Sequence, residues 1–277
     1  MSFAQIASTR KLRRLSRRKP SRAVRLANSA RPPRAEALAL TKFHFSKLEL
    51  CEKAIEERLF PLLDEIRPPE ERATLVVSRN DALLPMFFSM VLDLLRIDLV
   101  QIFEEGELDP VLETIGDRVA KKNSRELRRL IGISAEDLGL SAYLDGFRAI
   151  NVSRIRSIAG KELVEITQLL EASFAVGARV ETIRDAIQDR FTVTKSKAAL
   201  LARDQTLKLN GQITRQRQQA DGIVQYIWTT SGDSRVRPSH KALDGSIQSW
   251  DVPPPPGHPG EDYQCRCTAF PVLPELA

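Results

Sequence analysis

Two histidines and two cysteines gather near the C-terminal end of the chain. They are His240, His258, Cys265 and Cys267, and they include two of the three histidines and two of the three cysteines among the 277 residues. Imidazole nitrogen and thiolate sulfur are the ligands that Zn²⁺ prefers in proteins, so these four residues are a candidate zinc site.

The spacing of the two cysteines is unfavourable for such a site. Cys-x-Cys is closer than the usual Cys-x₂₋₄-Cys spacing, and we expect the two thiols to point to different faces of an extended strand. We therefore expect packed thiols, no cofactor and no stoichiometric metal, with zinc as the alternative. His240 is then expected to bond backbone or carboxylate groups between Asp233 and Gly245. A disulfide between the two cysteines would be strained.

The same stretch contains residue types that catalyse hydrolysis. Cys265, with His258 or His240 as a base and Asp244 to orient it, has the composition of a thiol nucleophile site. Four carboxylates have the composition of a metal-dependent nuclease site: Asp233, Asp244, Glu261 and Asp262. Neither set matches a local catalytic signature, and turns need these residue types in any case. We therefore expect that the protein is not an enzyme.

Several motifs follow one another in a fixed order here. A strand-like run ends at Trp228, a D-x-R-x-R-x-x-H block spans 233–240, Leu-Asp-Gly occupies 243–245, and a Pro-Gly loop ends in Cys-Arg-Cys at 265–267. The helix before them carries Ala-Arg-Asp-Gln-Thr at 202–206. This order resembles the phage Mu F-like minor head proteins, the phage head morphogenesis family, over about 180–275 and more weakly from 110.

We expect the motif residues to brace a small loop-rich domain rather than to catalyse a reaction. They are Arg203, Asn210, Trp228, Asp233, Arg235, Arg237, His240, Asp244, Gly245, His258, Cys265, Arg266 and Cys267. Arg203 and Asn210 are seven residues apart and share a helix face. Arg203 is expected to form a bidentate pair with the carboxylate of Asp233 or Asp244. Leu243-Asp244-Gly245 is expected to form a turn.

The elements that position these residues follow from the apolar periodicity. It predicts helices over 35–63, 70–104, 109–131, 135–150, 151–176, 180–191 and 195–220, with Thr194 as the N-cap of the last. Gly106 and Asp109-Pro110 are expected to separate helices. Extended runs at 222–228, 246–250 and 267–272 predict a small antiparallel sheet with long loops. The fold class is therefore α+β, divided into an arm at 1–34, a helical region at 35–150 and a Mu F-like α+β domain at 151–277.

The net charge of +6 comes from the first 34 residues. They hold eleven lysines or arginines and no acid, which leaves 31 basic against 36 acidic residues elsewhere. We predict a flexible arm that binds double-stranded DNA without sequence specificity. Packing on an acidic protein surface and organellar targeting are alternatives. The candidate DNA-binding residues are Arg10, Lys11, Arg13, Arg14, Arg17, Arg18, Lys19, Arg22 and Arg25.

Composition excludes some classes of protein. Three cysteines cannot form a disulfide scaffold and favour a reducing compartment. The charged N-terminus lacks the apolar block of a secretory signal. The most apolar stretch, 82–100, contains Pro85, Asp93, Arg96 and Asp98, so we expect a core helix and no membrane span. His44 and Cys51, alone on a helical pattern, are expected to be packed or at the surface.

The resemblance implies a function. It implies a structural minor head protein of a tailed bacteriophage that associates with portal, capsid or scaffold proteins. It also implies a place inside the capsid of the virion, and in the host cytoplasm during assembly. The alternative is an effector or enzyme, a nuclease or thiol hydrolase carried in the virion, because similar domains occur fused to toxins. Such toxins follow the head domain, and because only ten residues follow Cys267, no toxin is expected here.

Overall fold

A computed structural model describes residues 33–65, 83–102, 105–131, 140–176 and 178–272. The described chain is mostly helical and ends in a small sheet, as predicted. It forms two compact units, each assembled from separate segments. One contains the described residues of 41–111 and 149–200, and the other contains those of 33–40, 112–148 and 201–272. Neither unit corresponds to a single one of the ranges 1–34, 35–150 and 151–277.

Among the described residues, two helices, α6 and α7, each extend over two of the predicted ones. They are α3 (Arg34–Glu65), α4 (Leu83–Ile102), α5 (Glu105–Ile131), α6 (Leu140–Ala175), α7 (Val180–Ala220) and the short α8 (Pro238–Ala242). The predicted break at 150/151 is wrong, because no glycine or proline there interrupts the hydrogen bonding of α6. Gly106 and Pro110 lie within α5 and separate nothing.

Thr194 is not an N-cap, since α7 runs through it without interruption. Its side chain is buried, and its hydroxyl donates to Oε1 of Glu162 on α6 at 2.5 Å. A β-branched residue with a hydroxyl can occupy a helix interior when that hydroxyl has a partner. The tertiary contact therefore overrides the local capping preference.

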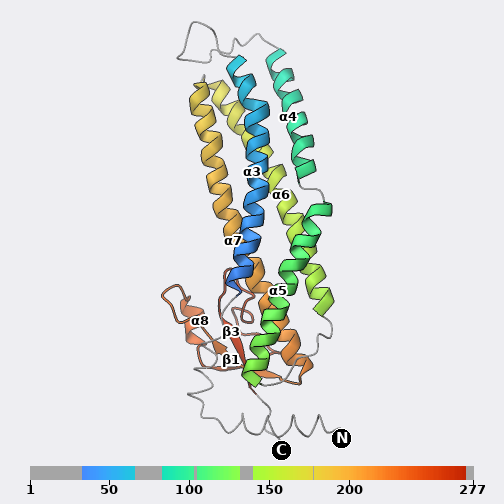
Figure 1. Ribbon diagram of the computed structural model, residues 1–277. Coiled ribbons are helices and arrows are strands. Elements are labelled where there is room, and N and C mark those ends of the chain that lie inside the picture. The colour runs from blue at the N-terminus through green and yellow to red at the C-terminus, as the bar shows by residue number, and fades with distance from the viewer. Residues whose placement is uncertain (1–32, 66–82, 103–104, 132–139, 177, 273–277) are drawn as a thin grey trace, which may run out of the picture. The chain divides into compact units, whose positions relative to one another are not determined.

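The unit formed by 41–111 and 149–200 is a helical bundle. In this unit α3, α4, α6 and α7 lie side by side (Figure 1). Apolar residues at three- and four-residue spacings, such as Ile55, Leu59 and Leu63 on α3, form its core. Ion pairs connect its helices, including Lys195–Glu52 at 2.8 Å and Arg58–Asp98 at 2.7 Å. His44 and Cys51 are both buried here, which fits the packed role expected for them.

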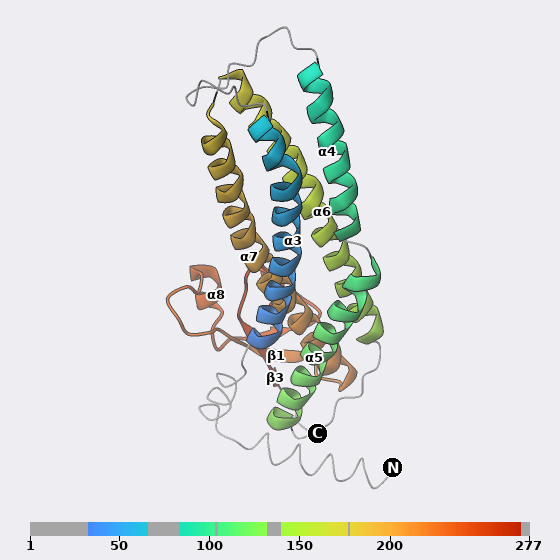
Figure 2. The ribbon, with the colours of Figure 1, turned by 45° about the horizontal axis from the view of Figure 1, so that its top comes forward.

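The other unit contains a three-stranded antiparallel sheet in the order β2-β1-β3. Its strands are β1 (Gln225–Thr229), β2 (Ile247–Ser249) and β3 (Thr268–Val272), close to the predicted runs. Tyr226 and Trp228, two residues apart on β1, are fully buried and pack with Trp250. β1 and β3 are seen together with the last turns of α7 in Figure 2.

Buried polar side chains attach α5 and the sheet to the second half of α7 in this unit. Arg217 is buried, and its Nη1 donates to the carbonyl of Ala120 at 2.8 Å and to Oδ1 of Asn123 at 2.9 Å. Gln218 donates to the carbonyl of Ala269 and accepts from Nε1 of Trp250, each at 3.0 Å. The half of α7 that follows residue 200 is therefore the scaffold on which the motif region is built.

Candidate functional site: a histidine and two thiols

A short helix brings His240 into the interior. Arg237 is extended at the N-cap of α8 and Pro238 is the first helical residue, where its missing N–H costs nothing. His240, two residues on, is 2 % exposed and packs edge-on against the ring of Trp228. The loop before β3 supplies Cys265 and Cys267, both buried.

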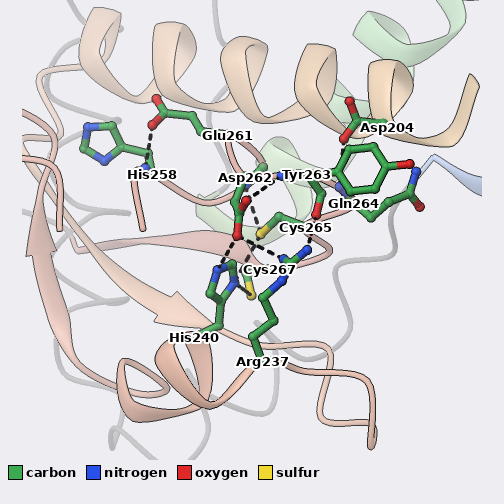
Figure 3. A network of polar contacts seen from close by, with 11 residues as sticks. Asp204, Arg237, His240, His258, Glu261, Asp262, Tyr263, Gln264, Cys265 and Cys267 are labelled. Atoms are coloured by element: carbon green, nitrogen blue, oxygen red, sulfur yellow. Dashed lines mark hydrogen bonds and ion pairs between the residues drawn. The ribbon is translucent and has the colours of Figure 1, made fainter. Parts of the chain in front are cut away.

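The three side chains converge. Nδ1 of His240 lies 3.6 Å from Sγ of Cys265 and 3.4 Å from Sγ of Cys267 (Figure 3). All three potential ligand atoms lie within 4.8 Å of one another. The expectation that the two thiols diverge is wrong, because side chains alternate along extended backbone and residues two apart share a face. Arg266, between them, points instead to Asp233.

A carboxylate occupies the other side of the imidazole. Nε2 of His240 lies 3.1 Å from Oδ2 of Asp262. That oxygen also lies 3.0 Å from Nη1 of Arg237, whose Nη2 donates to the carbonyl of Tyr263 at 2.6 Å. The partner of His240 is thus a carboxylate, as expected, but it lies outside the 233–245 loop in which we placed it.

The two thiols titrate as a pair. A hydrogen bond from Cys267 is the largest influence that lowers the pKa of Cys265, to about 6, and a backbone N–H from Gly260 at 3.4 Å also lowers it. The same contact with Cys265, followed by burial, raises the pKa of Cys267 well above its usual range. The close contact between the two sulfurs therefore makes the thiol of Cys265 more acidic than an isolated cysteine.

His258 does not join this cluster. Its Nδ1 lies 2.9 Å from the hydroxyl of Tyr226, and its ring packs against Trp250. Burial lowers the pKa of His258. Of the four residues of the zinc alternative, the structure brings three together and assigns the fourth to the packing of the sheet.

The 233–245 loop is braced from several directions. Asp233 accepts two hydrogen bonds from the guanidinium of Arg266, one of them at 2.6 Å. That pairing, as the largest cause, holds the pKa of Asp233 well below its usual range. Arg235 is exposed and lies 3.5 Å from the same carboxylate. Asp244 accepts from the backbone N–H of Thr230 at 2.8 Å, and Gly245 has a φ of 77°, as the predicted turn requires.

The role assigned to Arg203 is wrong. Arg203 is exposed, and Arg266 pairs with Asp233 in its place. One helical position changes the direction of a side chain by about 100°, so the neighbouring Asp204 is the residue that turns inward. Asn210 contacts α5, where its Oδ1 accepts from Asn123 at 3.2 Å.

Asp204 is a site residue that sequence reasoning missed. It is 2 % exposed, accepts from the backbone N–H of Gln264 at 2.7 Å and pairs with Lys208 at 2.9 Å. Gln264 has a φ of 56°, a left-handed backbone conformation that residues other than glycine rarely adopt. The Asp204–Lys208 pair at i and i+4 was the available sequence signal.

The thiol nucleophile hypothesis is partly supported in its geometry. His240 lies between Cys265 and Asp262 and contacts both. Asp244, the proposed orienting acid, instead accepts a hydrogen bond from the backbone N–H of Thr230. Cys265 is 3 % exposed and His240 is 2 % exposed. A substrate has no open route to the sulfur in this arrangement. The nine candidate DNA-binding residues, Arg10 to Arg25, lie outside the described residues.

The comparison with protein families decides where these motifs belong. Residues 164–270 match the family described as phage Mu protein F like protein. This segment belongs to the Mu F-like family. All residues of the His240, Cys265 and Cys267 cluster, with Asp204 and Asp262, fall within the Mu F-like segment. The recognition made from the motif order is confirmed.

One relative extends the similarity. An uncharacterized protein of Haemophilus influenzae (strain Rd) is 35 % identical over 147 residues, which are 49 % of this chain and 33 % of that protein. The similar stretch thus covers about a third of the length of this relative. No solved structure matches the chain. Within the described residues, the helices are too short or too polar to cross a membrane.

Proposed function

We propose that the protein is a structural minor head protein of a tailed bacteriophage that acts in head morphogenesis. The observation that carries this proposal is the match of 164–270 to the phage Mu protein F like family. The match covers the whole of α7, β1 and β2 and the first three residues of β3. The braced loops around His240 are the part with the most specific motifs. We infer association with portal, capsid or scaffold proteins and a location inside the capsid.

The architecture suits an assembly role. The motif residues make contacts within the protein. Arg266 pairs with Asp233, Arg237 pairs with Asp262, and Asp244 accepts a hydrogen bond from the backbone of Thr230. Such contacts keep long loops in one conformation without a large core, and a fixed surface is what repeated contacts in a shell require.

The test is genetic and structural. The gene is inactivated in the phage or prophage that carries it, and particles are examined by electron microscopy and mass spectrometry. We expect the protein in purified wild-type heads and fewer complete, DNA-filled heads in its absence. Normal numbers of filled, infectious heads without the protein would contradict the proposal.

We further propose that the acid-free segment 1–34 binds duplex DNA. Each phosphate neutralised contributes a slope of about −0.9 to the dependence of log affinity on log salt. Replacing Arg13, Arg14, Arg17 and Arg18 by Gln should therefore flatten the slope by about 3 to 4. The matched control replaces four exposed bases from elsewhere: Lys161, Lys197, Arg203 and Lys241. An equal loss of DNA affinity in both variants, or no loss of affinity in either, would contradict a DNA-binding arm.

The alternative is a thiol hydrolase carried in the virion. One observation favours it, namely the row of Cys265, His240 and Asp262, with a thiolate held by N–H donors. Burial of both Cys265 and His240 weighs against it. Alkylation by iodoacetamide of the native chain distinguishes the two, because a working nucleophile reacts quickly at Cys265 and a buried structural thiol does not.

A further inference from the structure

We propose that His240, Cys265 and Cys267 bind one Zn²⁺ ion that ties α8 to the segment before β3. A zinc site goes beyond the proposed assembly role and does not depend on it. It replaces the expectation of a metal-free site, which rested on thiols that diverge.

The distances fit a shared ion. With Zn–N near 2.0–2.1 Å and Zn–S near 2.3 Å, a tetrahedral ion separates its nitrogen and sulfur ligands by about 3.6 Å. Nδ1 of His240 lies 3.6 Å from one sulfur and 3.4 Å from the other. A neutral imidazole has one lone pair at Nδ1, so it can accept a hydrogen bond from only one thiol. Two sulfurs at nearly equal distance are better explained by an ion among all three atoms.

The outer contacts orient the ligand. Oδ2 of Asp262 lies 3.1 Å from Nε2 of His240 and accepts a hydrogen bond from the N–H there. The lone pair of the neutral ring is then at Nδ1, which faces the sulfurs. Zinc-bound histidines usually carry such a carboxylate on the opposite nitrogen. Arg237 in turn fixes Asp262, at 3.0 Å.

Donors surround the sulfurs. The backbone N–H of Gly260 points at Sγ of Cys265, 3.4 Å away. The indole Nε1 of Trp228 is fully buried in the same cluster as the two thiols and has no oxygen or nitrogen acceptor among the described residues. An N–H group directed at sulfur stabilises the thiolate, which is the form of cysteine that binds zinc.

A small cavity adjoins the two thiols. It has a volume of about 20 Å³, is lined in part by Cys265, Cys267 and Gly211, and is large enough for one water molecule. Three protein ligands and one water complete the four-coordination usual for zinc.

The test uses the tag-free full chain, purified without chelator from zinc-supplemented medium. Elemental analysis should find about one zinc per chain, and the Cys265→Ser/Cys267→Ser variant should retain less than about a tenth of it. Cys51→Ser, which removes the remaining buried thiol on α3, is the matched control and should keep the ion. Cobalt(II) added to stripped protein should give thiolate-to-metal charge-transfer absorption and the visible bands of a tetrahedral site.

A second variant covers the case in which the double variant does not fold. Asp262→Ala, at a half-exposed position, should bind zinc about 10 to 100 times more weakly in competition with a chromophoric chelator. Asp251→Ala, an exposed carboxylate near β2, should bind as the wild type does. Folded wild-type chain without metal and without cobalt charge transfer would overturn the proposal. So would zinc that persists without both thiols, another metal at that stoichiometry, or unchanged affinity in Asp262→Ala.

Discussion

The buried carboxylate of Asp204 accepts a hydrogen bond from the backbone N–H of Gln264 at 2.7 Å. This contact joins the middle of α7 to the turn that precedes the two cysteines. It helps to hold Gln264 at a φ of 56°, a left-handed conformation that is uncommon for residues other than glycine. The relationship explains how one helix positions the cluster without contributing a ligand to it.

Removal of that carboxylate should loosen the turn. Asp204→Ala leaves the partly buried N–H of Gln264 without its acceptor, and the free energy of unfolding should fall by about 1–3 kcal/mol. Arg203→Ala, one position away and exposed, should change it by less than about 0.5 kcal/mol. Urea unfolding followed by tryptophan fluorescence measures both. A larger loss at Arg203 than at Asp204 would restore the bracing role first assigned to the arginine.

The close approach between α7 and the 257–267 loop depends on Gly211. A Cβ at this position would lie 2.7 Å from the carbonyl oxygen of Pro259 and 3.3 Å from Cα of Gly260. Gly211→Ala should therefore destabilise the protein by about 1–3 kcal/mol. Gly146→Ala, also within a helix but with open space around it, should stabilise by about 0.5–1 kcal/mol. Thermal unfolding of the two variants should shift in opposite directions, and parallel shifts would refute the packing argument.

Gln218 connects α7 with two strands through both ends of its amide. Gln218→Leu removes the acceptor of Trp250 Nε1 and the donor to Ala269, and should cost about 2–4 kcal/mol, because both groups are buried. Gln218→Glu is the matched variant, since its ionised carboxylate keeps the acceptor and loses the donor, whereas its protonated carboxyl again offers both. Its free energy of unfolding should lie between those of the wild type and the Leu variant at a pH where the carboxyl is protonated. Equal stability of the Leu variant and the wild type would show that these bonds contribute nothing.

Acid should destabilise the protein through His44. Burial lowers the pKa of His44 from 6.5 to about 4, although a backbone contact with Ala198 opposes the shift. The unfolded chain binds the proton more readily, so the contribution to stability is complete above pH 6.5 and is lost as the pH falls to 4. The loss should reach up to about 3 kcal/mol.

The comparison with His44→Leu isolates this effect. The variant cannot titrate at residue 44, so its stability should fall less between pH 6.5 and pH 4 than that of the wild type. Urea unfolding at half-unit steps of pH provides the measurement. Identical pH profiles for the two proteins would remove His44 from the explanation of acid sensitivity.

The sequence by itself determined the class of fold, the three strands and the family. Strand positions followed from β-branched and aromatic residues between turn residues, and those preferences act locally along the chain. The order of motifs from Trp228 to Cys267 was equally local. The N-terminal charge is a matter of composition, and it stays a prediction because residues 1–32 are not described.

Only the tertiary structure decided which side chains meet. Whether Arg203 or Asp204 turns inward depends on the rotation of α7 against the 257–267 loop, and a shift of one residue reverses the answer. Thr194 could have begun a helix, but the buried Glu162 of another helix accepts a hydrogen bond from its hydroxyl. His240, Asp262 and the two thiols meet because a five-residue helix and a loop 22 or more residues later fold onto the same side of β1. No pattern in a single segment records such an encounter, since its energy comes from packing and hydrogen bonds between segments.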